Sequence, residues 1–204
     1  EDVIVPPMKA MKRDGNRVEL TCTAVEFGEN GFPKQFTAGD RKSLAAPVSL
    51  RFLSAKGDEL KFDKKTSLTR DKDDVQERRT IATGDGLSYT LSSQLDYVGA
   101  LTYVLTVKAE KPIALSDMRL EIPMVKDAAS YLMGFGKRGG LFTESFDWKW
   151  SDRAENYVWL GDATSGIQLK LTGANDNWDA SSLGPVGLPD GWYNNNKGGG
   201  SVKE

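Results

Sequence analysis

The chain has 204 residues, of which 39% are hydrophobic and 27% charged, which is enough apolar sequence to build a core without disulfides or metals. Its 27 basic and 29 acidic residues give a net charge of −2, which argues against nucleic acid as a partner. The sequence contains no histidine, one cysteine and no long apolar run, so it lacks the commonest general base, an internal disulfide and a predicted membrane-spanning segment.

Apolar and polar residues alternate with a period of two through most of the chain, which predicts antiparallel strands with one buried face. Between Leu115 and Met118 the alternation slips by one residue, which predicts a β-bulge near Ser116 and Asp117. Short Gly, Asn and Asp turns separate the strands. The predicted strands, in chain order, cover residues 17–25, 48–52, 87–92, 101–109, 118–124 and 167–171.

Cys22 continues the alternation of Val18 and Leu20, and we interpret it as a small buried core residue. A catalytic thiol would need a histidine partner, and the sequence has none. The strongly charged residues 64–79 indicate a strand pair with a solvated loop. A short helix is predicted near 126–133, after Pro123 and before Gly134.

Strands do not alternate with long helices, which argues against a TIM barrel or a doubly wound sheet. The prediction is therefore an all-β fold, a two-layer antiparallel β-sandwich of the supersandwich type. Residues 1–172 would form the sandwich. Residues 173–204, rich in Gly, Asn and Trp, would form a tail that either belongs to the same domain or begins a junction to another domain.

Residues 134–139 match the letters G-x-G-x-x-G, but no strand–helix unit surrounds them, so we interpret them as a glycine-rich turn. The alternative is a loop that presents Lys137 and Arg138 to a ligand. Three Asp residues cluster at 71–74, which we interpret as a solvated, charged turn, and Asp and Asn cluster at 175–179, the better candidate for calcium. Neither leads us to predict a cofactor or a metal.

All five tryptophans follow position 147. Phe146, Trp148 and Trp150 share one strand face, which indicates either core packing or an aromatic platform for sugar rings. Trp178, Trp192 and Tyr193 stand in polar sequence and are harder to bury. The candidate glycan-binding residues are Trp148, Trp150, Trp178, Trp192, Tyr193, Lys137 and Arg138.

Three acidic residues, Glu144, Asp147 and Asp162, lie near the aromatic cluster in the sequence. A glycosidase needs two facing carboxyl groups. Nothing in the sequence selects one pair, so no catalytic residue is predicted.

Several short segments, most of them after Leu120, resemble the N-terminal part of secreted bacterial proteins related to glycoside hydrolase family 123. The segments are Gly31-Phe-Pro-Lys-Gln, Leu44-Ala-Ala-Pro-Val, Leu120-Glu-Ile-Pro-Met, Tyr131-Leu-Met-Gly-Phe-Gly-Lys-Arg-Gly-Gly, Trp148-Lys-Trp, Val158-Trp-Leu-Gly-Asp-Ala, Gly166-Ile-Gln-Leu-Lys-Leu and Leu188-Pro-Asp-Gly-Trp-Tyr-Asn.

The resemblance implies a β-sandwich beside a TIM-like barrel that removes N-acetylgalactosamine with an Asp–Glu pair and the substrate's acetamido group. That pair belongs to the barrel, so no catalytic residue carries over to this chain. We expect a non-catalytic accessory domain of a secreted, periplasmic or cell-surface protein, whose partner is a C-terminal catalytic domain. The alternatives are a carbohydrate-binding module that uses exposed Trp side chains on a glycan, and a surface adhesion or protein-docking domain.

Overall fold

The computed structural model describes residues 4–84, 86–134, 137–149, 157–171, 192, 194–195 and 197–203. These residues form antiparallel sheets with a single short 3-10 helix among them, which confirms the predicted all-β fold. The chain divides into two compact units, Glu1–Met124 and Val125–Glu204, called unit 1 and unit 2 below. No helix in the described ranges is both long and apolar enough to cross a membrane.

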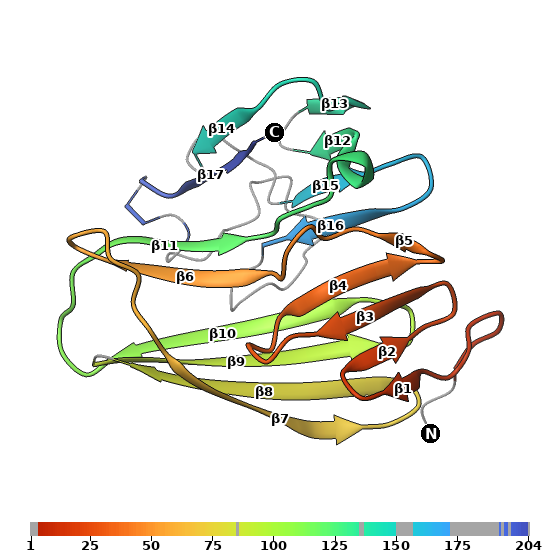
Figure 1. Cartoon of the computed structure of the whole chain (residues 1–204), viewed down its shortest axis with the longest axis horizontal. Helices are drawn as coiled ribbons and strands as arrows, with labels where there is room; N and C mark the ends of the chain where they lie inside the picture. Colours follow the sequence, from red (N-terminus) through yellow and green to blue (C-terminus); the bar gives the residue numbers. More distant parts are fainter. Residues whose placement is uncertain are drawn as a thin grey trace, which may run out of the picture. The chain divides into compact units, whose positions relative to one another are not determined.

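Unit 1 contains two larger sheets and one strand pair (Figure 1). The first sheet has the order β1-β2-β3-β4-β5, with β1 (Lys12–Asp14), β2 (Arg17–Glu19), β3 (Thr23–Phe27), β4 (Pro33–Ala38) and β5 (Arg41–Lys42). The second has the order β10-β9-β8-β7, with β7 (Asp63–Asp71), β8 (Val75–Gly84), β9 (Leu87–Asp96) and β10 (Leu101–Ala109). The pair joins β6 (Ser49–Ser54) to β11 (Leu115–Glu121).

The two larger sheets of unit 1 face each other across a shared apolar core, as in a β-sandwich. Val18, Val25 and Phe27 from the first sheet pack with Leu95 from β9, and all four are buried. Burying each such side chain stabilises the fold by about 1.5–3 kcal/mol. Tyr103 lies in the same interior and donates a hydrogen bond of 3.2 Å to the carbonyl of Gly31.

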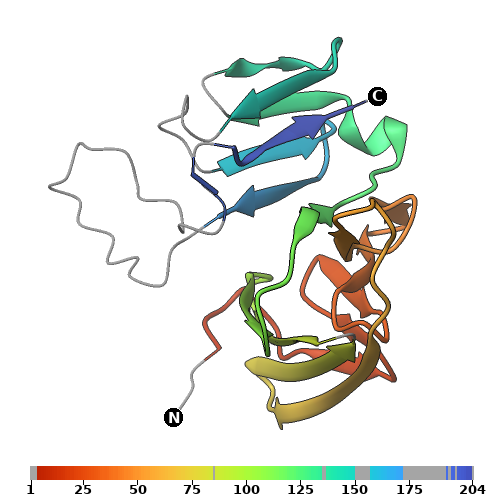
Figure 2. The ribbon, with the colours of Figure 1, turned by 90° about the vertical axis from the view of Figure 1, so that its left-hand side faces the viewer.

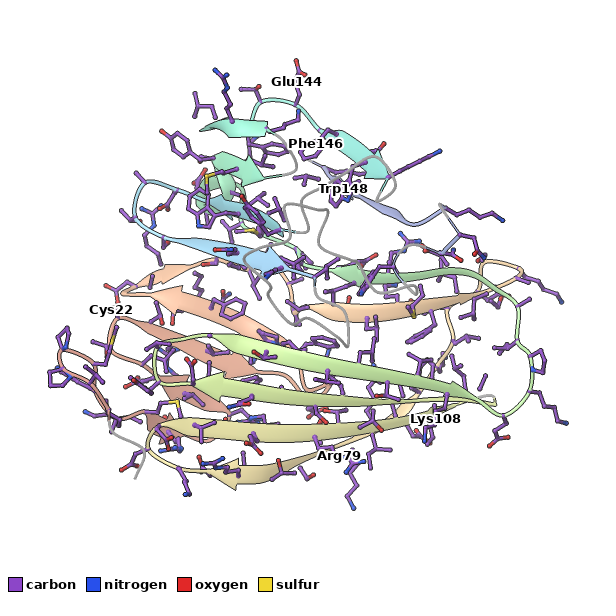
Figure 3. The ribbon with its side chains drawn as sticks, turned by 180° about the vertical axis from the view of Figure 1, so that it is seen from behind. Cys22, Arg79, Lys108, Glu144, Phe146 and Trp148 are labelled. Atoms are coloured by element: carbon purple, nitrogen blue, oxygen red, sulfur yellow. The ribbon has the colours of Figure 1, made fainter. Side chains whose placement is uncertain are left out.

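The structure corrects the predicted position of Cys22. Strand β2 ends at Glu19, and a tight turn follows that is closed by a 2.8 Å hydrogen bond from the Leu20 amide to the Thr23 carbonyl. Cys22 lies in this turn, between β2 and β3, and is exposed (Figure 3). The apolar alternation continues across this chain reversal, so beyond Leu20 it does not show on which side of a strand a residue lies.

Two other local predictions for unit 1 hold. The register between β11 and β6 shifts between Leu115 and Asp117, at the predicted bulge. The charged residues 64–79 fall in β7 and β8, which form a long hairpin joined by a short turn. Its charges do not all point to solvent, because Arg78 is buried.

Unit 2 contains a four-stranded sheet and a strand pair (Figure 2). The sheet has the order β13-β12-β15-β16, with β12 (Tyr131–Gly134), β13 (Lys137–Leu141), β15 (Tyr157–Gly161) and β16 (Gly166–Lys170). The pair joins β14 (Phe146–Lys149) to β17 (Gly199–Val202), so the end of the predicted tail belongs to a unit 2 sheet. The boundary predicted at 172/173 falls outside the described residues and stays a prediction.

The short helix predicted near 126–133 is the 3-10 helix η1 (Lys126–Ala129). Strand β12 begins two residues later. Its alternation of exposed Tyr131 and Met133 with buried Leu132 fits a strand with one buried face. Strand β12 is internal to the sheet, since it pairs with both β13 and β15.

Candidate functional site: the outer face of the unit 2 sheet

The four-stranded sheet of unit 2 has one face in a core and one face turned away from it. Leu132 and Val158 are buried in the core, and Leu160 and Leu169 pack against them. Residues one position along each strand point to the opposite face, because side chains alternate along a strand. We call this opposite side the outer face. It carries Tyr131, Met133, Gly139, Leu141, Tyr157, Trp159, Gly161, Gly166, Gln168 and Lys170.

Trp159 lies flat on the outer face over two glycines. Gly161 and Gly166 are partners in the β15–β16 register. A Cβ atom built on Gly161 would lie 2.4 Å from Cζ2 of the indole, and one built on Gly166 would lie 2.4 Å from both Cε2 and Cζ2. Only glycine leaves room for the ring at these two positions, so the sequence supports a half-buried indole spread across two strands.

Exposed apolar side chains surround this indole. Met133 stands opposite Trp159 in the β12–β15 register, and Tyr131 stands opposite Leu141 in the β12–β13 register. Their exposed fractions are 46% for Met133, 39% for Tyr131 and 67% for Leu141. Large apolar side chains gathered on one exposed sheet face indicate a contact surface for a ligand or another domain.

Two polar side chains on β16 border the aromatic part of the outer face. Gln168 is the register partner of Trp159, and Lys170 is the partner of Tyr157. Both are exposed. The arrangement therefore combines an aromatic surface with hydrogen-bond donors at its edge, which suits either an apolar protein surface or the C–H face of a sugar ring.

A family model described as "Glycoside hydrolase 123, third domain" matches residues 11–204. The chain belongs to this family. Among curated proteins, no significant match to the chain was found. The description numbers the domain third, whereas the sequence resemblance assigned it to the N-terminal part of such proteins, and that position stays a prediction.

Two of the tryptophans predicted to bind glycan contribute to the core of this glycoside hydrolase 123 domain. Trp148 and Trp192 both pack against the Leu132 and Val158 cluster. The Trp148 ring lies 5.6 Å from the Phe146 ring and over Gly200, where a Cβ atom would come within 2.3 Å of Cζ2 (Figure 3). Of the two interpretations of the Phe146–Trp148 face, core packing is the one that this geometry supports.

The other predicted glycan-binding residues are divided between β13 and regions that are not described. Lys137 places its ammonium nitrogen 4.4 Å from the centre of the Phe146 ring, a cation–π contact on the core side. Arg138 is exposed on β13. Trp150, Trp178 and Tyr193 lie outside the described residues, so their role stays a prediction.

The glycine-rich segment at 134–140 turns from β12 into β13, and no helix follows it. Gly134 has a φ of +122°, and a Cβ atom there would lie 2.5 Å from the carbonyl oxygen of Tyr157. The glycine is thus required by backbone conformation and by the close approach of β15. This accounts for a glycine at the last position of β12.

The acidic residues near the aromatic cluster have separate positions and partners. Oδ1 of Asp162 accepts hydrogen bonds from the amides of Thr164 and Ser165 at 2.6 and 2.9 Å, so it closes the β15–β16 turn. Asp147 is exposed on β14, and Glu144 is directed away from the ribbon in Figure 3. In the described ranges, no three His, Cys, Asp or Glu side chains gather as metal ligands, and residues 175–179 lie outside those ranges.

Sequence reasoning missed Trp159 and Tyr131 as site residues. The strand signal was present, because Tyr157 and Trp159 alternate with Val158 and Leu160. What the sequence did not reveal is the register that brings Gly166 beneath the indole and Met133 beside it.

Proposed function

We propose that this domain is a non-catalytic accessory β domain of a secreted bacterial glycoside hydrolase-like protein, where it supports or flanks the catalytic domain. The outer face is the observation that carries the proposal. The family description numbers this domain third, which implies that proteins of the family contain other domains. An accessory domain is expected to keep an exposed apolar surface where a neighbouring domain docks.

The apolar character of the outer face favours a domain contact over a purely structural sheet surface. Tyr131, Met133 and Leu141 come from two adjacent strands and are all more than a third exposed. Inter-domain interfaces bury about 600–1,500 Å² and mix apolar with polar groups. The outer face, with Gln168 and Lys170 at its border, has this composition.

The test is association of the chain with the family's catalytic domain supplied as a separate polypeptide. Met133→Lys should weaken the association because it places a charge in the centre of the apolar contact. Ile81→Lys is the matched control, because Ile81 is 48% exposed on the outward side of β8 in unit 1. Equal association of both variants with the catalytic domain would show that the outer face is not the docking surface. Hydrolysis of an aryl N-acetylgalactosaminide by the isolated chain would overturn its non-catalytic role.

Trp159 favours a second candidate function, carbohydrate binding at the same face. An indole spread flat on a sheet is the arrangement on which sugar rings stack. A panel of N-acetylgalactosamine-containing, plant and algal glycans, followed by calorimetry, tests it. Binding that is lost in Trp159→Ala would establish the module. If the folded chain binds no glycan of the panel, the accessory role remains, with surface adhesion and protein docking as the alternative functions.

A further inference from the structure

Arg78 in unit 1 is a buried guanidinium that no carboxylate neutralises within the described part of the chain. The residue is 8% exposed and points from β8 into the space between the two large sheets. Its Cζ atom lies 4.3 Å from the centre of the Phe27 ring. Its Nε donates to Oε1 of Gln76 at 2.9 Å, and its Nη1 donates to Oδ1 of Asn16 at 3.2 Å.

Both hydrogen-bond partners are neutral amides, and the described residues supply no acceptor for Nη2. A buried charge costs several kcal/mol unless it is paired and hydrogen-bonded. Burial lowers the pKa of Arg78 and the charge of Asp71 raises it in part, yet an arginine stays protonated at neutral pH. Arg78 is therefore a permanent positive charge, and the hydrogen bonds of the described residues leave some of its donors unused.

Asp71, whose charge acts on Arg78, is paired with other groups. Arg13 forms an ion pair with Oδ1 of Asp71, and Nε2 of Gln76 donates to the same oxygen at 3.2 Å. Gln76 thus bridges Asp71 and Arg78, and with Asn16 it fixes the plane of the Arg78 guanidinium. Fixing the guanidinium in advance reduces the entropy that a ligand must remove on binding.

Arg78 lines an open groove of about 500 Å³ between β7 and the turns that follow β1 and β3. Leu68, its register partner on β7, is 49% exposed although it stands on the inner side of the sheet, so the groove is open at this edge. Lys64, Thr66 and Asn16 add cationic and polar groups. A volume of this size suits a small ligand or a saccharide unit.

We propose that this groove binds the anionic group of an acidic saccharide, a carboxylate or a sulfate ester, through the guanidinium of Arg78. The anion would complete the pairing that the described part of the chain leaves open, and the planar guanidinium matches a carboxylate or sulfate edge. Lys64 would add attraction at the rim. The saccharide class rests on the proposed function, whereas the requirement for an anion rests on Arg78 itself.

The experiment uses the whole 204-residue chain and calorimetry at low ionic strength, where charge pairing is least screened. The probes are an oligogalacturonide, a sulfated galactose oligosaccharide and the neutral galactose oligosaccharide. Saturable binding of an acidic probe, without binding of the neutral one, is the expected result. Preference between the two acidic probes identifies carboxylate or sulfate as the ligand group.

Arg78→Gln should weaken acidic binding about tenfold or more, because it removes a charge-assisted contact. Arg79→Gln is the matched control, since Arg79 is the next residue of β8, is exposed and projects from the other face (Figure 3). It should change the affinity less than about twofold, because the Arg79 side chain lies on the opposite face of the sheet and does not line the groove. Absence of acidic binding, or equal weakening by both variants, would overturn the proposal.

If Arg78→Gln does not fold, Lys64→Glu reverses an exposed rim charge without touching the core. It should weaken acidic binding, whereas Lys108→Glu on β10, also exposed, should not. Equal effects of these two variants would refute a binding groove at β7. Neutral-glycan binding lost in Trp159→Ala reports only on the outer face, so the two proposals can fail separately.

Discussion

Gly166→Ala tests whether the Trp159 indole lies on the glycine pair of the outer face. The added Cβ would lie 2.4 Å from Cε2 and Cζ2 and 2.6 Å from Nε1 of the ring. Carbon atoms in contact are normally about 3.5–4.0 Å apart, so the ring must move by more than about 1 Å. The φ of Gly166 is not in the left-handed region, so the overlap with the ring is the main penalty.

The expected effect is a modest loss of stability. Overpacking costs about 1–3 kcal/mol, and replacing glycine by alanine returns about 0.4–1 kcal/mol by restricting the unfolded chain. The free energy of unfolding of unit 2 should therefore fall by up to about 2.6 kcal/mol. The indole should also become more exposed, which shifts its fluorescence emission to longer wavelength.

Urea unfolding followed by circular dichroism measures the change, with a double-mutant cycle to assign its cause. In a Trp159→Ala background the same Gly166→Ala change should be neutral or stabilising, because the overlapping ring is gone. Gly140→Ala on β13 is the control, since nothing lies within 4 Å of its added Cβ. A loss of stability that is equal with and without the indole would refute the packing of Trp159 on Gly166.

Three further predictions concern unit 1. Cys22 is exposed, so a thiol reagent should label it in the folded chain at the rate of a free thiol, and labelling limited by unfolding would contradict its position. Gly31→Ala should cost about 2–4 kcal/mol in urea unfolding, because its φ is +80° and its Cβ would lie 2.1 Å from Oγ1 of Thr80. The hydrogen bond from Arg51 is the largest cause that lowers the pKa of Glu59 below 4.5. The Arg51–Glu59 pair therefore stabilises the folded chain above pH 4.5, and this stabilisation is lost as the pH falls through the lower pKa that Glu59 has in the folded chain. In an NMR titration, Arg51→Gln should return the Glu59 pKa toward 4.5.

The sequence predicts strands best where the alternation is long and stays within one strand. The stretch 101–109 became β10, and the slip near Ser116 became the bulge between β11 and β6. Cys22 shows the limit, because a tight turn interrupts an alternation that still looks continuous. Period-two patterns give the side of a strand on which a residue lies, and they do not show where the chain reverses.

The same limit explains the partial prediction of the site. Alternation correctly placed Phe146 and Trp148 on one face, but it could not say whether that face is core or surface. The answer depends on Gly200 in β17, which pairs with β14 from far along the sequence. Likewise, Gly166 leaves room for Trp159 only through the β15–β16 register. Non-local register of this kind has no signature in a single sequence.

Arg78 shows why a charged run can conceal a buried site. The many charges of residues 64–79 predicted a strand pair with a solvated loop, yet Gln76, Arg78, Thr80 and Ala82 form a buried row on β8. A polar residue is kept in such a row only when its partners meet the cost of its burial. Gln76 and Asn16 satisfy two of the donors of Arg78, and no carboxylate among the described residues forms an ion pair with its guanidinium, so an anion is the ligand to test in this groove.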